Sequence, residues 1–536
     1  MDAGFLTRRF EGALPAVDSA RPALSFDLDE TLSHDSLAKR SSRIGNALLA
    51  RGVKPGDRVG ILLYNCIDYI PLYLAIMRVG AIAVRLNFRL AEDELAFALA
   101  DSGCMMLVFH DDFTQSLDNI RDGLPVRWYV RIPRSSDQAA PFSVSWLEFL
   151  SDASDDPPVC ARPQGASPAM LMYTSGTTGR PKGALWTHDN VLWFGAIQAI
   201  KWRYDPDTVA MTTGPMYHVG AIEDLLSAAL AVGGHAVCLR SGAFNIRHVL
   251  AVATAHKVTD LMLFPYMVYD LVRDPDFESL DLSTVRRIVS GGDPVLPWAI
   301  EALATHHPHI EFVQIYGLTE GSPIGACSTG AESRAHSDSV GRPMPFTEIS
   351  IRDDEGVALK SGAEGEIWIR GPAVASGYWH RPEATAETFV DSWCRTGDLG
   401  RATDDGLLVV SGRTKDMIRS GGENIYPREV EDVLARHPGV REAAVIAVPD
   451  SKFLEAVCAV VVPADPSAPP DADDLIRHVR SLLAGYKKPR HLVFTDRIPR
   501  TPSGKIQKYR LREQYRHLGA EPDAPTYTAP RQDKRS

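Results

Sequence analysis

Short apolar runs alternate with longer segments of helical periodicity along much of this chain. Residues 34–52 show the helical pattern, and the runs "RVGILLY", "GAIAVRL" and "CMMLVF" that follow have the length of strands. The alternation returns over residues 248–264 and leads to "VRRIVSGG". Strands separated by helices pair in parallel, because each helix carries the chain back across the sheet. We therefore expect an α/β fold of parallel sheets with crossover helices, which bind ligands at the carboxyl ends of the strands.

Two later changes of pattern divide the chain. "SVGRPMPFTEISIRD" and "GEIWIRG" alternate apolar and polar residues, which predicts a β subdomain. Beyond Arg413, helical and strand patterns predict a compact α+β unit. We expect a large N-terminal domain at 1–414, a small C-terminal domain at 415–515 and a disordered tail at 516–536, where proline and charge are frequent.

Composition excludes several classes of protein. A net charge of -11 argues against a nucleic-acid partner. The seven cysteines are scattered without a C-x-x-C pair, so we expect neither disulfides nor a zinc site. The N-terminus lacks an apolar signal core, and Arg78 interrupts the apolar run "YIPLYLAIMRVGAIAV", which excludes an integral membrane segment there. A cytoplasmic protein is expected, with a homodimer as the default assembly.

The stretch "YTSGTTGRPKGA" at 173–184 predicts a phosphate site. Its glycines allow successive N–H groups to face one anion, and hydroxyl groups and a lysine add further donors. The candidate ATP-binding residues here are Thr174, Ser175, Gly176, Thr177, Thr178, Gly179 and Lys182. It is not the common P-loop, because Gly179 is followed by Arg180 and Pro181. A flexible linker is the alternative, and the apolar run "AMLMY" before the loop disfavours it.

Further polar clusters follow apolar runs, and each has an ordinary structural alternative. Tyr316 and Glu320 in "YGLTE" suit a base and a magnesium ion, or a helix start capped by Thr319. The "GGD" at 291–293 suits an adenine amine or a plain turn, and Asp398 in "RTGDLG" suits a ribose or a tight turn. Four further residues complete the set. Arg413, Lys415 and Lys505 could equally be solvated charges, and His218 could equally be a packed or capping histidine.

Taken together, these motifs resemble one family over nearly the whole chain. "YTSGTTGRPKG", "YGLTE", "RTGD", "GRTKDMIRSGGENIYPREVE" and "PRTPSGKI" occur in the order found in the adenylate-forming superfamily of acyl-CoA synthetases, luciferases and peptide-synthetase adenylation domains. The resemblance is greatest to fatty-acyl and aryl-CoA ligases. It implies that a carboxylic acid reacts with ATP to give acyl-AMP and pyrophosphate, and that coenzyme A then takes the acyl group and releases AMP, with Mg²⁺ as cofactor.

The resemblance also implies a role for each matched residue. Lys505 reaches the reacting groups from the small domain, His218 lies beside the acyl pocket, and Glu320 with Thr178 binds magnesium. Lys415 is the hinge about which the mobile small domain rotates between the two reactions. The nucleotide is held by residues 174–182 and by Gly291, Gly292, Asp293, Tyr316, Gly317, Thr319, Asp398, Arg413 and Lys505, and the thiol tunnel by Gly421, Gly422 and Glu423.

Three departures from the family pattern concern the acceptor. Cys394 stands where an aromatic residue is usual, Leu454 where a glycine is usual, and Arg419 where an apolar residue or lysine is usual. An acyl-AMP ligase that transfers to a carrier-protein thiol therefore stays an alternative, as does a non-catalytic nucleotide-binding protein.

The sequence predicts only the chemical class of the carboxylic acid substrate. The histidine argues against an amino acid, and the segments around the expected pocket suit an apolar or bulky acid. Of the adjacent Glu223 and Asp224, we expect at least one to be solvated or paired.

Overall fold

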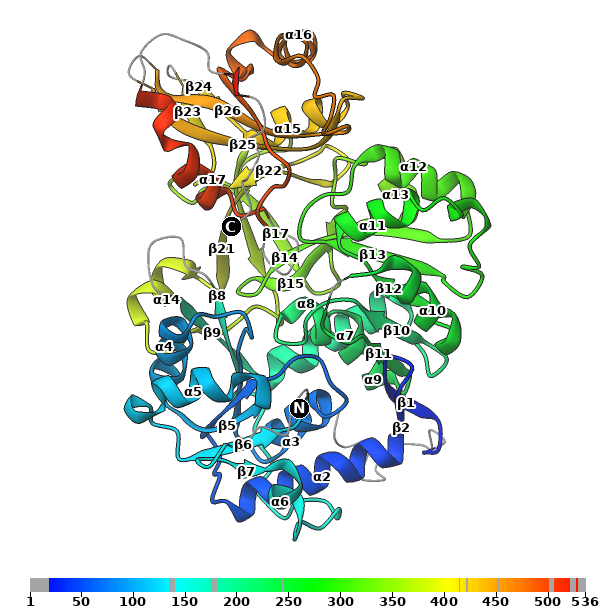
Figure 1. Ribbon diagram of the computed structural model, residues 1–536, viewed down its shortest axis with the longest axis vertical. Coiled ribbons are helices and arrows are strands. Elements are labelled where there is room, and N and C mark those ends of the chain that lie inside the picture. Colours follow the sequence, from blue (N-terminus) through cyan, green and yellow to red (C-terminus); the bar gives the residue numbers. More distant parts are fainter. Residues whose placement is uncertain are drawn as a thin grey trace.

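The computed structural model describes residues 19–134, 140–174, 181–242, 244–413, 415–420, 423–450, 453–500, 506–520 and 527–528. The described residues form four β-sheets, which we call the N-terminal, central, small and C-terminal sheets. Helices pack around the N-terminal and central sheets in the lower part of Figure 1, and the C-terminal sheet lies at the top.

The N-terminal sheet is parallel except at one edge. Its strands in spatial order are β19 (Gly377–Tyr378), β9 (Lys182–Thr187), β8 (Pro168–Thr174), β4 (Ile82–Arg85), β3 (Arg58–Leu62), β5 (Cys104–His110), β6 (Trp128–Ile132) and β7 (Val144–Ser145). Strands β8 to β7 run parallel, whereas β9 and β19 are antiparallel to their neighbours. All of β4 is buried, as expected of a parallel strand that is covered on both faces.

The central sheet repeats this arrangement. Its strands in spatial order are β16 (Arg342–Pro343), β15 (Ser322–Cys327), β14 (Glu311–Leu318), β13 (Arg287–Gly291), β12 (Asp260–Met262), β10 (Val209–Thr212), β11 (His235–Cys238), β1 (Pro22–Phe26) and β2 (Glu30–Ser33). Strands β14 to β1 run parallel. The α/β fold with parallel sheets is therefore confirmed, and the carboxyl ends of β8, β13 and β14 carry the predicted nucleotide residues.

Helices begin where side chains cap their first N–H groups. The Thr187 hydroxyl accepts from the Asn190 backbone N–H at the start of α7, and the Asn190 side chain accepts from the Thr187 N–H in return. The α-helices of the large domain are α2 (His34–Ala50), α3 (Tyr69–Arg78), α4 (Glu92–Ser102), α5 (Thr114–Ile120), α6 (Trp146–Leu150), α7 (His188–Trp202), α8 (Val219–Ala221), α9 (Ser227–Val232), α10 (Ile246–His256), α11 (Pro265–Val272), α12 (Pro297–His306), α13 (Gly330–Ala335) and α14 (Pro382–Thr388). Short 3-10 turns occur at η2 (Asp111–Phe113), η3 (Arg121–Gly123) and η5 (Phe277–Ser279), and one π-helical turn at η4 (Ile222–Leu226).

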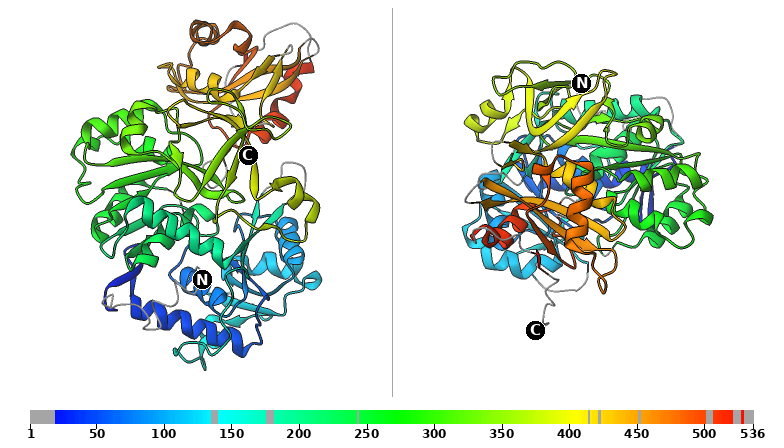
Figure 2. Two further views of the ribbon diagram at one scale, coloured as in Figure 1. Left: turned by 180° about the vertical axis from the view of Figure 1, so that it is seen from behind. Right: turned by 90° about the horizontal axis from the view of Figure 1, so that it is seen from above.

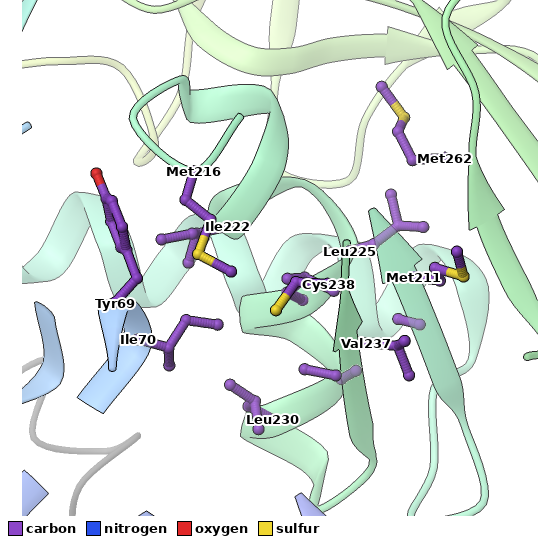
Figure 3. Close-up of a cluster of buried hydrophobic side chains, with 14 of the residues drawn as sticks. Tyr69, Ile70, Met211, Met216, Ile222, Leu225, Leu230, Val237, Cys238 and Met262 are labelled. Carbon is purple, nitrogen blue, oxygen red and sulfur yellow. The ribbon is translucent and has the colours of Figure 1, made fainter. Parts of the chain in front are cut away.

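One hydrophobic core joins the two parallel sheets. In Figure 3, Tyr69 and Ile70 from α3 face Ile222 and the side chains of the β10 and β11 strands. Because residues from both sheets belong to the same buried cluster, the two sheets cannot move independently without exposing apolar surface.

The small sheet is the predicted β subdomain. It consists of β17 (Glu348–Arg352), β18 (Gly365–Arg370), β21 (Trp393–Ala402), β20 (Phe389–Val390) and β22 (Leu408–Arg413), all paired antiparallel. Strand β22 leads directly towards the C-terminal sheet (Figure 1).

The C-terminal sheet and its helices have hydrophobic clusters of their own. The strands are β24 (Glu423–Ile425), β23 (Ile418–Ser420), β26 (Leu454–Pro463), β27 (His491–Phe494), β28 (Tyr527–Thr528) and β25 (Val440–Asp450). The helices are α15 (Pro427–Ala435), α16 (Ala472–Leu482), α17 (Lys508–Tyr515), η6 (Gly485–Lys487) and η7 (Arg516–Ala520). Apolar side chains on both faces of this sheet are buried within the unit itself, which projects from the large domain in the left view of Figure 2.

The structure also bears on the expectations for the cysteines, for a membrane segment and for the C-terminal tail. All seven cysteines lie in the described part of the chain and all are free. Within the described residues, no helix combines the length and apolarity that crossing a bilayer needs. Residues Arg516–Ala520 form a 3-10 helix although the sequence analysis placed them in a disordered tail, because Leu518 is buried against the C-terminal sheet.

Candidate active site

The carboxyl end of β8 meets the turn after β14 through one carboxylate. The Thr174 hydroxyl donates to Glu320 Oε1 at 2.7 Å, and the Tyr378 hydroxyl donates to the same oxygen at 3.1 Å. Lys182 is the register partner of Thr174, and its Nζ lies 5.2 Å from the centroid of the Tyr378 ring. Three of the predicted phosphate and magnesium residues are thus brought together from β8, β9 and the β14 turn.

A buried tryptophan fixes the turn that carries Glu320. Trp186 in β9 is fully buried, and its indole N–H donates to the Thr319 carbonyl at 3.0 Å. Residue 319 follows a strand and does not begin a helix, so the alternative of a helix start at this motif is excluded. These contacts together hold the turn beside the carboxyl end of β8.

A second cluster lies between the central and small sheets. The Tyr316 hydroxyl donates to Asp398 Oδ2 at 2.8 Å, and Arg413 Nε lies 3.1 Å from Asp398 Oδ1. Asp398 is buried, its negative charge raises the pKa of Arg413, and burial raises the pKa of Tyr316 well above its usual value. The predicted tight turn at Asp398 is wrong: the residue lies inside the long strand β21, opposite Arg413 in β22, between Gly397 with a φ of +69° and a register shift at Leu399 and Gly400.

The glycines near the predicted adenine site have a packing reason of their own. A Cβ on Gly291 would lie 2.4 Å from Cγ1 of Ile315, its register partner in β14. A Cβ on Gly317 would lie 2.3 Å from the Ser322 carbonyl oxygen. Gly292 has a φ of +96°, which favours glycine, and the Asp293 carboxylate lies 3.7 Å from Arg500 of the small domain.

His218 caps the short helix α8. Its Nδ1 accepts from the Gly220 backbone N–H at 3.0 Å, which is the capping role considered as an alternative from the sequence. The His218 carbonyl accepts from Arg85 Nη2 at 2.8 Å. A neutral imidazole whose Nδ1 accepts a hydrogen bond carries its proton on Nε2, so this ring is held in one tautomer.

Several predicted residues lie outside the described part of the chain. These are Ser175, Gly176, Thr177, Thr178, Gly179, Gly421, Gly422 and Lys505. Lys415 is exposed and follows β22, and the next residue, Asp416, forms an ion pair at 2.7 Å with Arg512 of the small domain. Glu423 begins β24 and is exposed.

Two residues at the site escaped the sequence analysis. Tyr378 stands in "SGYWH", which carries no motif that the reasoning used. Arg85 is a fully buried charge within an apolar strand, and it pairs with Glu223 at 2.5 Å. An arginine inside a buried parallel strand requires a partner, so this position could have been recognised from its charge alone.

Two protein families match this chain over most of its length. Residues 15–379 match the AMP-binding enzyme family, and residues 429–505 match the AMP-binding enzyme C-terminal domain. The chain belongs to the AMP-binding enzyme family.

Relatives and solved structures of similar length support the assignment. The AMP-binding enzyme is 39% identical over 487 residues to a feruloyl-CoA synthase of Amycolatopsis sp, a match that covers 90% of this chain and 94% of the relative. It is 34% identical over 498 residues to the fatty acid–acyl-carrier-protein ligase ScoC of Streptomyces coeruleorubidus, covering 90% and 92%. The crystal structure of ATP-bound MatB from Rhodopseudomonas palustris superposes with a TM-score of 0.88 at 29% identity, covering 97% and 100%. The predicted ATP-dependent, AMP-forming acyl-CoA ligase is thereby confirmed.

Two departures of this AMP-binding enzyme from the family pattern lie beside the expected thiol segment. Leu454 is 72% exposed with a φ of +74°, and it pairs with Ser420, directly before residues 421–422. The Arg419 N–H donates to Glu455 Oε2 at 2.7 Å. The third departure, Cys394, is buried in β21 of the large domain and so lies apart from them.

Proposed function

We propose that this enzyme activates an apolar or aryl carboxylic acid and transfers it to coenzyme A. The observation that carries the proposal is that Glu320, in the turn after β14, meets Thr174 at the end of β8, the register partner of Lys182. Tyr316, in the same strand β14, also binds Asp398 of the small sheet. A binding protein without catalysis has no need for a carboxylate that is fixed by two hydroxyl groups beside a cation.

The formation of acyl-AMP depends more on neutralising the negative charges of the acid and the phosphates than on a general base. One oxygen of the acid forms a bond to the α-phosphorus while the bond from that phosphorus to pyrophosphate breaks, so two anions must approach each other. Lys182 is a half-buried cation at the end of the phosphate loop and is suited to the leaving pyrophosphate. We assign Asp398 and Arg413 to the ribose, and Lys505 to the point where acid and phosphate meet.

The residues present fit a magnesium ion. Glu320 and the Thr174 and Tyr378 hydroxyl groups form a set of hard oxygen atoms, with a single carboxylate. Magnesium is commonly bound through one or two carboxylates and the phosphates of the nucleotide. Glu320 would hold the ion, which when bound supplies positive charge next to the phosphates.

Coenzyme A is the acceptor in the acyl-CoA ligase reaction. In the second reaction the thiol sulfur forms a bond to the acyl carbon, AMP leaves with the electrons of the broken bond, and the thiol proton passes to solvent. The relative ScoC acts on an acyl-carrier protein, and Leu454 departs from the family next to the thiol segment, so a carrier-protein thiol is the second candidate.

Pyrophosphate release from magnesium ATP tests the proposal. Fatty, aryl and polycyclic acids are compared, each alone, with coenzyme A and with a phosphopantetheinylated carrier protein. Release that requires the acid and rises with coenzyme A supports the proposal, whereas a rise only with the carrier protein supports the alternative. Lys505→Ala is expected to abolish most release, and Lys360→Ala, which removes an exposed lysine, serves as the matched control. Absence of release with every acid, or near-normal release by Lys505→Ala, contradicts the assignment.

A further inference from the structure

The carboxylate of Asp101 joins two segments that are far apart in the sequence. Its Oδ2 accepts from the hydroxyl of Tyr173, at the end of β8, at 2.8 Å. Its Oδ1 forms an ion pair with Arg381, the residue directly before α14. Asp101 lies in the last turn of α4, and α14 lies next to α4 in Figure 1. The Asp101 side chain is only 11% exposed, so solvent screens these contacts little.

The same two segments meet again on Glu320. Thr174 directly follows Tyr173, and its hydroxyl donates to Glu320 Oε1. Tyr378 stands three residues before Arg381, and its hydroxyl donates to the same oxygen. One carboxylate therefore receives both hydroxyl groups at the site, and a second carboxylate joins the two segments that carry them.

The Tyr173 ring connects Asp101 to the end of β8. Its centroid lies 6.4 Å from that of Phe97, another residue of α4, in an edge-to-face arrangement. A Cβ on Gly183, the register partner of Tyr173 in β9, would lie 3.3 Å from Cζ of this ring. Because the ring packs closely against both α4 and β9, a change at its hydroxyl shifts the strand end that carries Thr174.

The segment around β19 is short and depends on similar anchors. It pairs with β9 through Gly377 and Tyr378 alone, fewer residues than most strands use. The Tyr378 N–H accordingly donates to the Thr385 hydroxyl at 2.9 Å, and that hydroxyl donates to the Arg381 carbonyl at 2.8 Å. The ion pair between Arg381 and Asp101 thus fixes the backbone from which the Tyr378 side chain reaches the site.

We propose that Asp101 is a positioning residue that sets the orientation of the Glu320 carboxylate through the two hydroxyl groups bound to it. This inference rests on the proposed function, in which Glu320 holds the magnesium ion next to the phosphates of ATP. Both Asp101 oxygens are engaged by protein groups, so Asp101 acts through these neighbours rather than as a ligand. Removal of a group that orients a metal ligand typically weakens metal binding by about 10–100-fold.

Binding of α,β-methylene-ATP tests the inference without the reaction, because carbon replaces the bridging oxygen that would leave with pyrophosphate. Calorimetry measures its Kd with Mg²⁺ and in EDTA. Asp101→Ala should weaken binding by about 10–100-fold with Mg²⁺ and by clearly less in EDTA. Tyr173→Phe, which keeps the ring and removes the hydroxyl, should give the same pattern with a smaller loss. Asp93→Ala, at an exposed position of the same helix, is the matched control and should leave both constants unchanged.

The dependence on Mg²⁺ separates positioning from a merely structural role. In the positioning role, Asp101→Ala also raises the Mg²⁺ concentration that gives half-maximal pyrophosphate release, and excess Mg²⁺ restores most of the rate. A structural role predicts a lower melting temperature with equal losses of affinity in Mg²⁺ and in EDTA, and that result overturns the inference. Tyr173→Phe decides by the same criterion if Asp101→Ala does not fold.

The outcomes also distinguish this inference from the proposed function. Binding of the analogue by the wild type without any dependence on Mg²⁺ overturns the inference, while acid-dependent pyrophosphate release still supports the proposed function. Conversely, a Mg²⁺-dependent loss of affinity in Asp101→Ala supports the inference even if the wild type releases no pyrophosphate with any acid, a result that contradicts the proposed reaction.

Discussion

Replacing Glu223 with glutamine should destabilise the large domain by about 3–5 kcal/mol, the loss typical when one partner of a buried ion pair is removed. Arg85 is 2% exposed and Glu223 is 1% exposed, so water cannot compensate the charge that remains. The Arg85 guanidinium also donates to the Met216 and His218 carbonyl oxygens. Arg85→Met should therefore cost at least as much as Glu223→Gln, because it leaves a carboxylate and two carbonyl groups without their donor.

With the single variants Arg85→Met and Glu223→Leu, the double variant Arg85→Met/Glu223→Leu isolates the interaction energy of the pair. It leaves only the two carbonyl groups unsatisfied, so it should be more stable than Arg85→Met alone, with a coupling energy of about 3 kcal/mol or more. Urea unfolding measures each variant, and hydrogen exchange of the amides at 216–227 confirms that the same region has lost protection. The reasoning is refuted if the double variant loses as much free energy of unfolding as the two single variants together, or if Glu223→Gln loses less than about 1 kcal/mol. Such values are typical of solvated ion pairs.

Three further predictions concern other parts of the chain. Burial, with the charge of Arg134, lowers the pKa of His110 to about 4, so the unfolded chain binds a proton that the folded chain does not as pH falls below about 6.5. Between pH 6.5 and about pH 4, His110 alone should lower the free energy of unfolding by about 1.4 kcal/mol per pH unit. Urea unfolding of the wild type and of His110→Gln at pH 7 and pH 4.5 measures this, and the variant should lose less free energy of unfolding between the two pH values. Leu454→Gly should stabilise the small domain by about 0.5–1 kcal/mol, because glycine tolerates the φ of +74°, whereas Leu454→Ala should give no gain in the same unfolding assay. Asp398→Asn should weaken ATP binding by about 10–100-fold in calorimetry, since hydrogen bonds to a charged group contribute about 1.5–3 kcal/mol, and unchanged affinity would remove Asp398 from the nucleotide site.

Local patterns predicted the elements and the order of the site motifs. The run "GAIAVRL" predicts a strand, and the motifs predict that Thr174 and residues 316–320 lie at strand ends, where the structure has them. These features depend on periodicity and on glycine and hydroxyl chemistry over a few neighbouring residues, which a sequence displays directly.

Contacts between distant segments were not predictable in the same way. Arg85 and Glu223 are separated by 138 positions, and no local pattern couples a strand residue to a turn in the other sheet. Tyr378 reaches Glu320 only because β19 adds to the N-terminal sheet. The sequence analysis explained Gly291 by a turn or by an adenine contact. The structure adds a second reason, because Ile315 on the adjacent strand leaves no room for a side chain at this position.

The pairing of β19 with β9 has a consequence for synthesis of the chain on the ribosome. Residues Gly377 and Tyr378 pair with Leu185 and Ala184, so the outer edge of β9 stays open until almost two hundred further residues have been made. At about 5–20 residues per second this interval lasts roughly 10–40 s. During that time β9 presents an unpaired edge on which other chains can add strands. Nascent chains stalled before β19 should therefore require chaperone protection that chains stalled after it do not.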